Sequence, residues 1–215
     1  MTSKDIYPDT RHKRLVVICL DGSSAFFRRK HQRIYYSDVI KKALIKYFNI
    51  PSGVTFILLD TRSGIIFSKI RKAIKVIKEY NQDCNTLFLT GKSYGGWHIV
   101  KILNRIKKIL KYKKIILMTV DACSIKKILK NTRIKPSQVD FIRNYFQTNE
   151  RVLNGAVLEM KGLNLGTWIE EDLTYSIVHG DKINHWNIVD HPDIYHAVDK
   201  SIQALLMILT GQIKD

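Results

Sequence analysis

Short apolar runs alternate with amphipathic stretches through the first half of the chain. Four runs are continuous and rich in β-branched residues, which is typical of strands buried on both faces of a sheet. These runs lie at residues 15–20, 54–59, 86–90 and 114–120. Apolar residues recur at helical spacing in three further stretches, at residues 37–48, 65–80 and 96–111. This alternation predicts a parallel sheet with helices on both of its faces.

The pattern is weaker in the second half of the chain. Residues 136–147 predict a helix, because four apolar side chains would share one of its sides: Phe141, Ile142, Tyr145 and Phe146. Residues 156–160 predict a last strand. Glycines and acidic residues interrupt the pattern between residues 162 and 184, so no element is predicted there.

Two helix starts carry their own signals. Ser37 is expected to be an N-cap, because a serine oxygen can accept a free helical N–H. Pro192 suits a first helical turn and predicts a final amphipathic helix at residues 193–210. Together the elements predict the α/β class, with a mostly parallel central sheet of about five or six strands and helices on both faces. We expect one domain over residues 1–215, with residues 1–14 as a basic N-terminal arm.

Composition narrows the class of protein. The chain has 215 residues, of which 45% are hydrophobic, and this is enough for a substantial core. No apolar run approaches the ~20 residues of a membrane-spanning helix, and the N-terminus lacks the apolar segment of a signal peptide. The three cysteines are widely spaced and indicate buried thiols in a reducing compartment. We therefore expect a cytoplasmic protein.

The net charge has two interpretations. Lys and Arg number 36 against 19 Asp and Glu, which gives +17 at pH 7. Such a field attracts anionic partners, such as nucleic acid or acidic lipid headgroups. The excess is mainly lysine spread over helices together with many Ile and Asn residues, which also fits an AT-rich coding sequence. No aromatic-basic nucleic-acid module is visible, and both interpretations stay open.

The strongest motif is Gly91-Lys-Ser93-Tyr-Gly95. It follows the predicted strand at residues 86–90 and leads into an apolar helix, which is the order of a nucleophile elbow. In such an elbow the serine sits on a strained turn, and glycines let neighbouring backbone pass close to it. The helix N-terminus then points its N–H groups at the serine, where an oxyanion would develop. The bare pattern is weak, and its position between strand and helix gives it weight.

A reactive serine needs an imidazole to take its proton, and the imidazole needs a carboxylate to hold its tautomer. In this kind of site the chain order is serine, acid, histidine. His185 is the preferred base because it lies in a loop just before the last helix. His191 and His179 are alternatives, although His191 abuts Pro192 and favours a structural role.

Four aspartates are candidates for the acid that orients the base. Asp121 directly follows the strand at residues 114–120 and is our first candidate; Asp140, Asp172 and Asp181 are fallbacks. In an open parallel sheet, ligands bind beyond the carboxyl ends of the strands. Ser93, Asp121 and the turn at residues 21–24 all fall at such ends. The alternative role for Asp121 is capping of the loop that follows.

At these residues the chain resembles a small α/β-hydrolase of the lipase, esterase and thioesterase kind. The resemblance rests on residues 91–96, 15–22 and 120–121, and on His185 with residues 188–192. Most members of this family carry the acid one strand later than Asp121, and a minority carry it at this position. The Asp-Gly-Ser-Ser turn at residues 21–24 differs from the usual His-Gly pair, no sizeable lid insertion is present, and the chain is short.

The resemblance implies acyl transfer. Ser93 would attack, an acyl-enzyme would form, and water activated through His185 would hydrolyse it. The oxyanion would be held by the backbone N–H of Tyr94 and by one from the turn that holds Gly22, Ser23 and Ser24. No metal or other cofactor is expected, because the cysteines and histidines lack metal-ligand spacing.

Three functions remain in competition. The first is hydrolysis of a small-molecule or lipid ester, or of a thioester. The second is a basic α/β scaffold that binds nucleic acid or an acidic membrane without catalysis. The third is a phospholipase-like hydrolase that docks peripherally on acidic membranes through its net positive charge.

Overall fold

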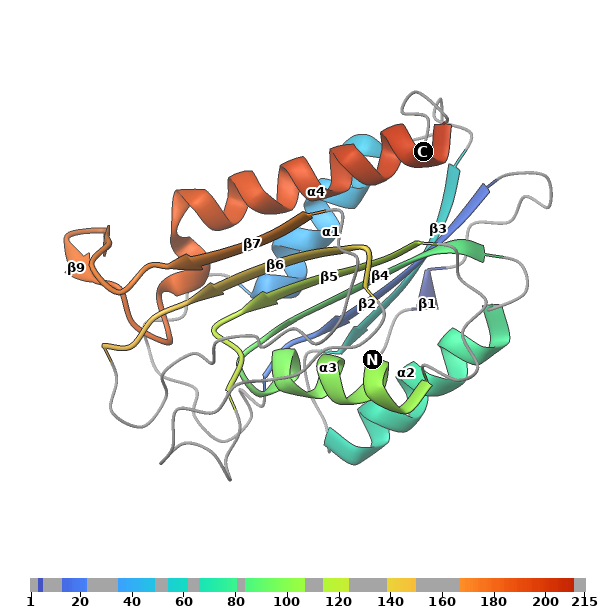
Figure 1. Cartoon of the computed structure of the whole chain (residues 1–215), viewed down its shortest axis with the longest axis horizontal. Coiled ribbons are helices and arrows are strands. Elements are labelled where there is room, and N and C mark those ends of the chain that lie inside the picture. Colours follow the sequence, from blue (N-terminus) through green and yellow to red (C-terminus); the bar gives the residue numbers. More distant parts are fainter. Residues whose placement is uncertain are drawn as a thin grey trace.

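A central β-sheet forms the middle layer of the structure (Figure 1). The structure is a computed structural model, and it describes residues 4–5, 13–22, 35–48, 54–61, 66–80, 84–106, 114–123, 139–149 and 167–210. Within these residues the sheet has seven strands in the order β1-β3-β2-β4-β5-β6-β7. Their bounds are β1 Lys4–Asp5, β2 Lys13–Leu20, β3 Val54–Thr61, β4 Cys84–Lys92, β5 Lys114–Val120, β6 Phe141–Phe146 and β7 Thr167–Asp172. The short β1 runs antiparallel to β3, and the other six strands are parallel. The predicted mostly parallel sheet is confirmed.

Among the described residues, helices α1 to α4 cover the two faces of this sheet (Figure 1). They are α1 Tyr36–Tyr47, α2 Ile66–Tyr80, α3 Tyr94–Ile106 and α4 Pro192–Thr210. Helices α1 and α4 pack on one face and α2 and α3 on the other. Side chains of β2 alternate between the two cores: Leu15 and Val17 face α1 and α4, whereas Val16 and Ile18 face α2 and α3. Burial on both faces explains why this strand is a continuous apolar run.

The predicted helix at residues 136–147 is wrong, because β6 occupies Phe141–Phe146. Apolar residues at positions 141, 142, 145 and 146 fit one side of a helix, but they fit equally a strand with two buried faces. Ile142 faces the α2–α3 core and Tyr145 the α1–α4 core. The sheet prevails because β6 pairs with β5 on one edge and with β7 on the other.

The stretch in which no element was predicted holds β7 and a short hairpin, β8 Ile177–Val178 and β9 Asp181–Lys182. Strand β7 is the last in the described sheet order, and its acidic residues are typical of an edge strand. The strand predicted at residues 156–160 lies outside the described residues.

Ser37 is not the N-cap of α1, which starts at Tyr36 with Tyr35 in the cap position. The Ser37 hydroxyl instead donates to Asp21 Oδ2 at 2.7 Å, and the Ser37 backbone N–H donates to the same oxygen at 3.2 Å. A carboxylate at a helix N-terminus is stabilised by the helix dipole. This contact ties the start of α1 to the end of β2.

Other features bear on earlier expectations. All three cysteines are buried as thiols. Helix α4 begins at Pro192, as the sequence predicts. Part of the stretch expected to be an N-terminal arm enters the sheet, since Lys4 and Asp5 pair with β3. Among the described residues, no helix has both the length and the apolar character needed to cross a bilayer.

Candidate active site

Ser93 is the single residue between β4 and α3, and its backbone has a φ of 56°. A positive φ is strained for a residue with a side chain and persists only where the surroundings impose it. Here the Ser93 N–H donates to Val120 O at 2.9 Å, and the Ser93 carbonyl accepts the N–H of Cys123 at 3.1 Å. The end of β5 therefore holds the turn from both sides. This is the strand–turn–helix geometry that the elbow motif predicts.

Two glycines permit this geometry. A Cβ on Gly95 would lie 1.9 Å from the carbonyl oxygen of Leu20, so α3 can start against the end of β2 only without a side chain there. A Cβ on Gly22 would lie 2.9 Å from Ser93 Oγ. The backbone of Gly22 therefore packs directly against the Ser93 side chain.

The expected oxyanion donors lie on two sides of Ser93. Tyr94 is the first residue of α3, where backbone N–H groups lack an intrahelical acceptor and carry partial positive charge. Gly22 lies against the serine side chain on the β2 side. Ser23 and Ser24, the other candidates in that turn, lie outside the described residues.

Asp121 and His185 meet although 64 residues separate them. His185 Nδ1 lies 2.5 Å from Asp121 Oδ2, and both side chains are buried. A carboxylate can only accept a hydrogen bond, so Nδ1 is the donor in this contact, and in the neutral imidazole Nε2 is then the acceptor. Asn184 shapes the histidine loop, because its Oδ1 accepts the backbone N–H groups of Trp186 and Asn187.

Asp121 also has an unusual backbone, with a φ of 48°. It is fully buried, and its N–H donates to Tyr145 O at 2.6 Å. Gln147, which follows β6, donates from Nε2 to both carboxylate oxygens, at 3.1 and 3.4 Å. Sequence reasoning missed Gln147 because it assigned this stretch to a helix. No local pattern marks a glutamine at the end of a strand as a partner for a distant aspartate.

The Ser93 hydroxyl has a neighbour that sequence reasoning also missed. Ser93 Oγ lies 3.6 Å from Cys123 Sγ. Within the described structure, Ser93 and His185 form no hydrogen bond with each other. The structure therefore joins Asp121 to His185, and the transfer of a proton from Ser93 to His185 stays a prediction.

Lys92, directly before Ser93, is buried. Burial lowers the pKa of its ammonium group, while the negative charges of Asp21, Asp121 and Asp190 act in the opposite direction. Lys92 thus lies within electrostatic range of three carboxylates near the strand end that holds Ser93.

His98 is a buried packing residue. Its Nδ1 lies 2.7 Å from Tyr94 O, and its ring packs edge-on against the Tyr94 ring at 4.3 Å between centroids. Burial lowers the pKa of His98 to about 4, so the ring is neutral at neutral pH. It supports the first turn of α3 from within the helix.

The alternative bases lie elsewhere. His191 Nδ1 accepts the backbone N–H of Asp193 at 3.2 Å at the start of α4, which is the structural role expected of it. His179 is exposed in the turn of the β8–β9 hairpin, with a φ of 53°.

The alternative acids make other contacts. Asp140 accepts the N–H of Ile115 at 2.6 Å, and Asp172 accepts that of Thr174 at 2.9 Å. Asp181 is exposed in β9. In the described part of the chain, Asp121 is the carboxylate that contacts His185. No group of three His, Cys, Asp or Glu side chains gathers there as a metal site.

Comparison with known proteins places the fold. No protein-family model and no curated protein sequence matches this chain. A protein from Agrobacterium vitis S4 that is described as a hydrolase is similar in structure, with a TM-score of 0.56 and 10% identity over 96% of this chain and 98% of that one. A hyperthermophilic esterase from the archaeon Pyrobaculum calidifontis is similar with a TM-score of 0.50 and 9% identity, over 95% of this chain and 77% of that one. At such identities the likeness concerns the fold, which is α/β-hydrolase-like.

Proposed function

We propose that the chain is a serine hydrolase that cleaves an ester or a thioester, with Ser93 as nucleophile, His185 as general base and Asp121 as the acid that orients it. The observation that carries the proposal is the 2.5 Å contact between Asp121 and His185. This contact lies at the carboxyl ends of the parallel strands, where Ser93 occupies a strained turn with a φ of 56°. The chain order of these three residues also matches the order in α/β-hydrolases.

The mechanism follows from these positions. Ser93 Oγ attacks the carbonyl carbon of the substrate while its proton passes to His185 Nε2, and Asp121 stabilises the imidazolium through Nδ1–H. The N–H groups of Tyr94 and Gly22 donate to the oxyanion. The tetrahedral adduct collapses, the alcohol or thiol leaves with the proton from His185, and an acyl-enzyme remains. Water then attacks in the same manner and releases the acid and free Ser93.

One movement is required before attack. The Ser93 hydroxyl contacts Cys123 Sγ and would rotate toward His185 when substrate binds. Catalytic hydrogen bonds are often long or misaligned without substrate and tighten in the complex.

A fluorophosphonate probe tests the nucleophile, because it labels only activated serines. The protein should react, and Ser93→Ala should not. Ser201→Ala is the matched control, since Ser201 is a buried serine in α4; this variant should react like the parent. Labelling that persists in Ser93→Ala would show that another residue reacts and would refute the assignment.

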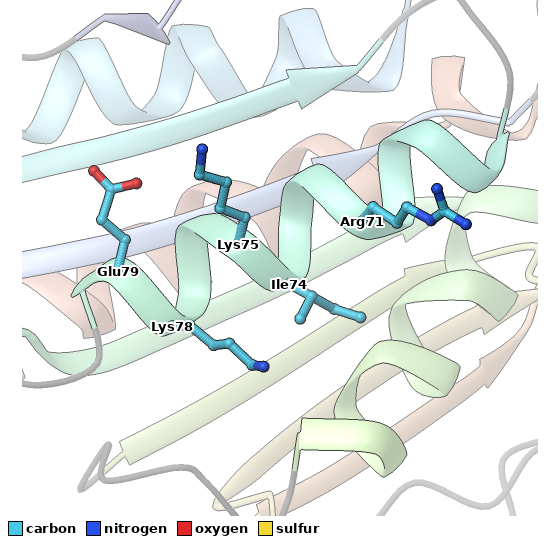
Figure 2. A pocket seen from close by; sticks show the side chains of 5 residues that line it. All are labelled: Arg71, Ile74, Lys75, Lys78 and Glu79. Carbon is cyan, nitrogen blue, oxygen red and sulfur yellow. The ribbon is translucent and has the colours of Figure 1, made fainter.

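The charge supports a second proposal, that the exposed side of α2 docks on an acidic lipid bilayer. Helices α2 and α3 together carry seven basic residues and one acidic residue, whereas α1 and α4 carry four and three. A shallow hollow of about 760 Å³ on α2 is lined by Arg71, Ile74, Lys75, Lys78 and Glu79 (Figure 2). The lining residues Arg71, Lys75 and Lys78 follow helical spacing, so their charges lie along one side of the helix.

Vesicle binding tests this second proposal. Each Lys or Arg near an acidic bilayer contributes about 1 kcal/mol of binding free energy. The double variant Arg71→Glu, Lys75→Glu should therefore lose at least about tenfold in affinity for vesicles that contain phosphatidylserine. The matched control Lys41→Glu, Lys42→Glu on α1 should lose much less. Equal losses would show that only net charge matters, and salt-sensitive binding to duplex DNA in place of vesicles would favour nucleic acid.

A further inference from the structure

Two amide side chains that follow β6 contact Asp121 and the hairpin that leads to His185. Gln147 reaches Asp121, and Asn149 reaches the hairpin that leads to His185. We refer to Gln147 and Asn149 as the amide clamp. Neither residue has a part in the proposed chemistry, and neither was expected from the sequence.

The orientation of the Gln147 amide follows from its second contact. Gln147 Oε1 accepts the backbone N–H of Asn149 at 2.8 Å. A backbone N–H can only donate, so the atom that faces it is the oxygen of the amide. The amide nitrogen must then face Asp121, where it donates to both carboxylate oxygens. Gln147 is therefore fixed as a donor to the acid.

Asn149 acts on the other side of the pair. Its Nδ2 donates to Thr174 O at 2.5 Å and to Ile183 O at 2.8 Å. These carbonyls lie just before β8 and just after β9, so one amide group closes the base of the hairpin. His185 follows Ile183 by two residues. Its backbone is therefore held at a fixed position relative to β6.

A further contact strengthens the same junction. The backbone N–H of Thr148 donates to Thr174 Oγ1 at 2.9 Å. The three consecutive residues 147–149 thus all bond to the acid or to the segment before the histidine. The turn of the hairpin has two residues with positive φ, His179 at 53° and Gly180 at 84°, as in type I′ turns.

We propose that Gln147 and Asn149 are positioning residues that hold Asp121 and His185 in register with each other. The inference deepens the proposed hydrolase function and rests on it for its catalytic consequence. Asp121 and His185 are 64 residues apart in the sequence. Contacts from residues 147–149 to both sides of the pair restrict their relative movement more than the Asp121–His185 bond does alone. Gln147 is suited to this role because an amide can donate to a buried carboxylate without adding a charge that would compete with His185.

The first test replaces Gln147 with an apolar side chain of similar length. Gln147→Met should lower kcat about 10- to 100-fold, because small misplacements at a catalytic site cost this much. KM should change little, because Gln147 does not touch the substrate in the proposed mechanism. Gln147→Glu should lose more, because it sets a second carboxylate against Asp121.

Asn144→Leu is the matched control. Asn144 is a fully buried amide in β6 whose side chain bonds to Thr119 and Glu170. We expect this variant to lose stability and to keep its kcat. If Gln147→Met and Asn144→Leu lower kcat equally, the effect of Gln147 is general to the strand and the inference is wrong.

A second readout does not depend on activity. The proton between His185 Nδ1 and Asp121 should give a far-downfield N–H resonance in a ¹⁵N-edited spectrum of the whole chain. Gln147→Met and Asn149→Ala should each shift or broaden it, and Asn144→Leu should leave it in place. An unchanged resonance in both clamp variants would overturn the inference. A resonance that responds as expected, in a protein that cleaves no ester or thioester, would support the clamp and refute the proposed function.

Discussion

The two halves of the proposed site are built by different means. The Ser93 half is positioned by backbone, since Gly22, Gly95 and the end of β5 pack so closely around the turn that added atoms would collide. The Asp121–His185 half is positioned by side chains that reach across long sequence separations. The first half should therefore fail when an atom is added. The second should fail when a hydrogen-bonding atom is removed.

The largest effect of a substitution is expected in the Asp121–His185 half of the site. Asp121→Asn presents an amide to His185 Nδ1 and favours the tautomer that carries its proton on Nε2, which cannot accept a proton from Ser93. We expect kcat/KM for a simple ester to fall about 10⁴-fold with the fold intact. Asp140→Asn, which alters a carboxylate bonded to Ile115 N, should stay close to the parent. A loss of less than tenfold in Asp121→Asn would remove Asp121 from the site.

In the Ser93 half, an added side-chain atom should cost the most stability at Gly95. Gly95→Ala places a Cβ 1.9 Å from Leu20 O, and relief requires the start of α3 to move away from β2. We expect a loss of about 3 kcal/mol or more in the free energy of unfolding, measured by urea titration. Gly180→Ala is the comparison, because Gly180 has a φ of 84° and open space around it. It should cost only the backbone strain of about 1–2 kcal/mol, and equal losses would argue against close packing at Gly95.

In the Ser93 half, an added side-chain atom at Gly22 should also lower activity. Gly22→Ala brings a methyl group to 2.9 Å from Ser93 Oγ and should turn the hydroxyl away from its attacking position. We expect kcat/KM to fall about 100-fold. The cost in stability should disappear when Ser93→Gly is added, because the two side chains no longer collide. A stability cost that persists in the double variant would mean that Gly22 is needed for another reason.

The smallest expected effect is the pH dependence that His98 gives to the free energy of unfolding, in the Ser93 half. Burial lowers the pKa of His98 to about 4, so between pH 6.5 and 4 the unfolded chain binds a proton that the folded chain does not. Stability from this group is therefore full above pH 6.5 and is lost as the pH falls. At pH 5 the loss should be about 2 kcal/mol. His98→Gln should show a shallower decline in urea titrations from pH 7 to 5, and identical slopes would contradict the burial argument.

The two halves of the site also differ in how far they can be predicted from sequence. The Ser93 half can be predicted from consecutive residues, because a strand, a Gly-x-Ser-x-Gly turn and a helix are local sequence patterns. The parallel sheet was equally accessible up to Val120, where each buried strand is a continuous apolar run. Positions 21, 93 and 121 could be placed at one edge because parallel strands end together.

The side-chain half was less accessible. Residue type and position predict His185 and Asp121 as candidates, but their contact depends on the path of the chain between them. Residues 141–147 carry a pattern that suits a helix or a doubly buried strand, and only pairing with β5 and β7 decides between them. Gln147 and Asn149 could not be found without that strand. Ser37 was misread because Asp21, a distant residue, takes its hydroxyl.

A crystal structure of the protein after reaction with a fluorophosphonate would show whether Ser93, His185 and Asp121 act together. We expect phosphorus bonded to Ser93 Oγ and a phosphoryl oxygen about 2.7–3.1 Å from the N–H groups of Tyr94 and Gly22. We also expect His185 Nε2 within about 3.2 Å of Ser93 Oγ. An adduct on another residue, or a His185 ring that stays in contact with Asp121 but points away from the bonded serine, would refute the proposed mechanism.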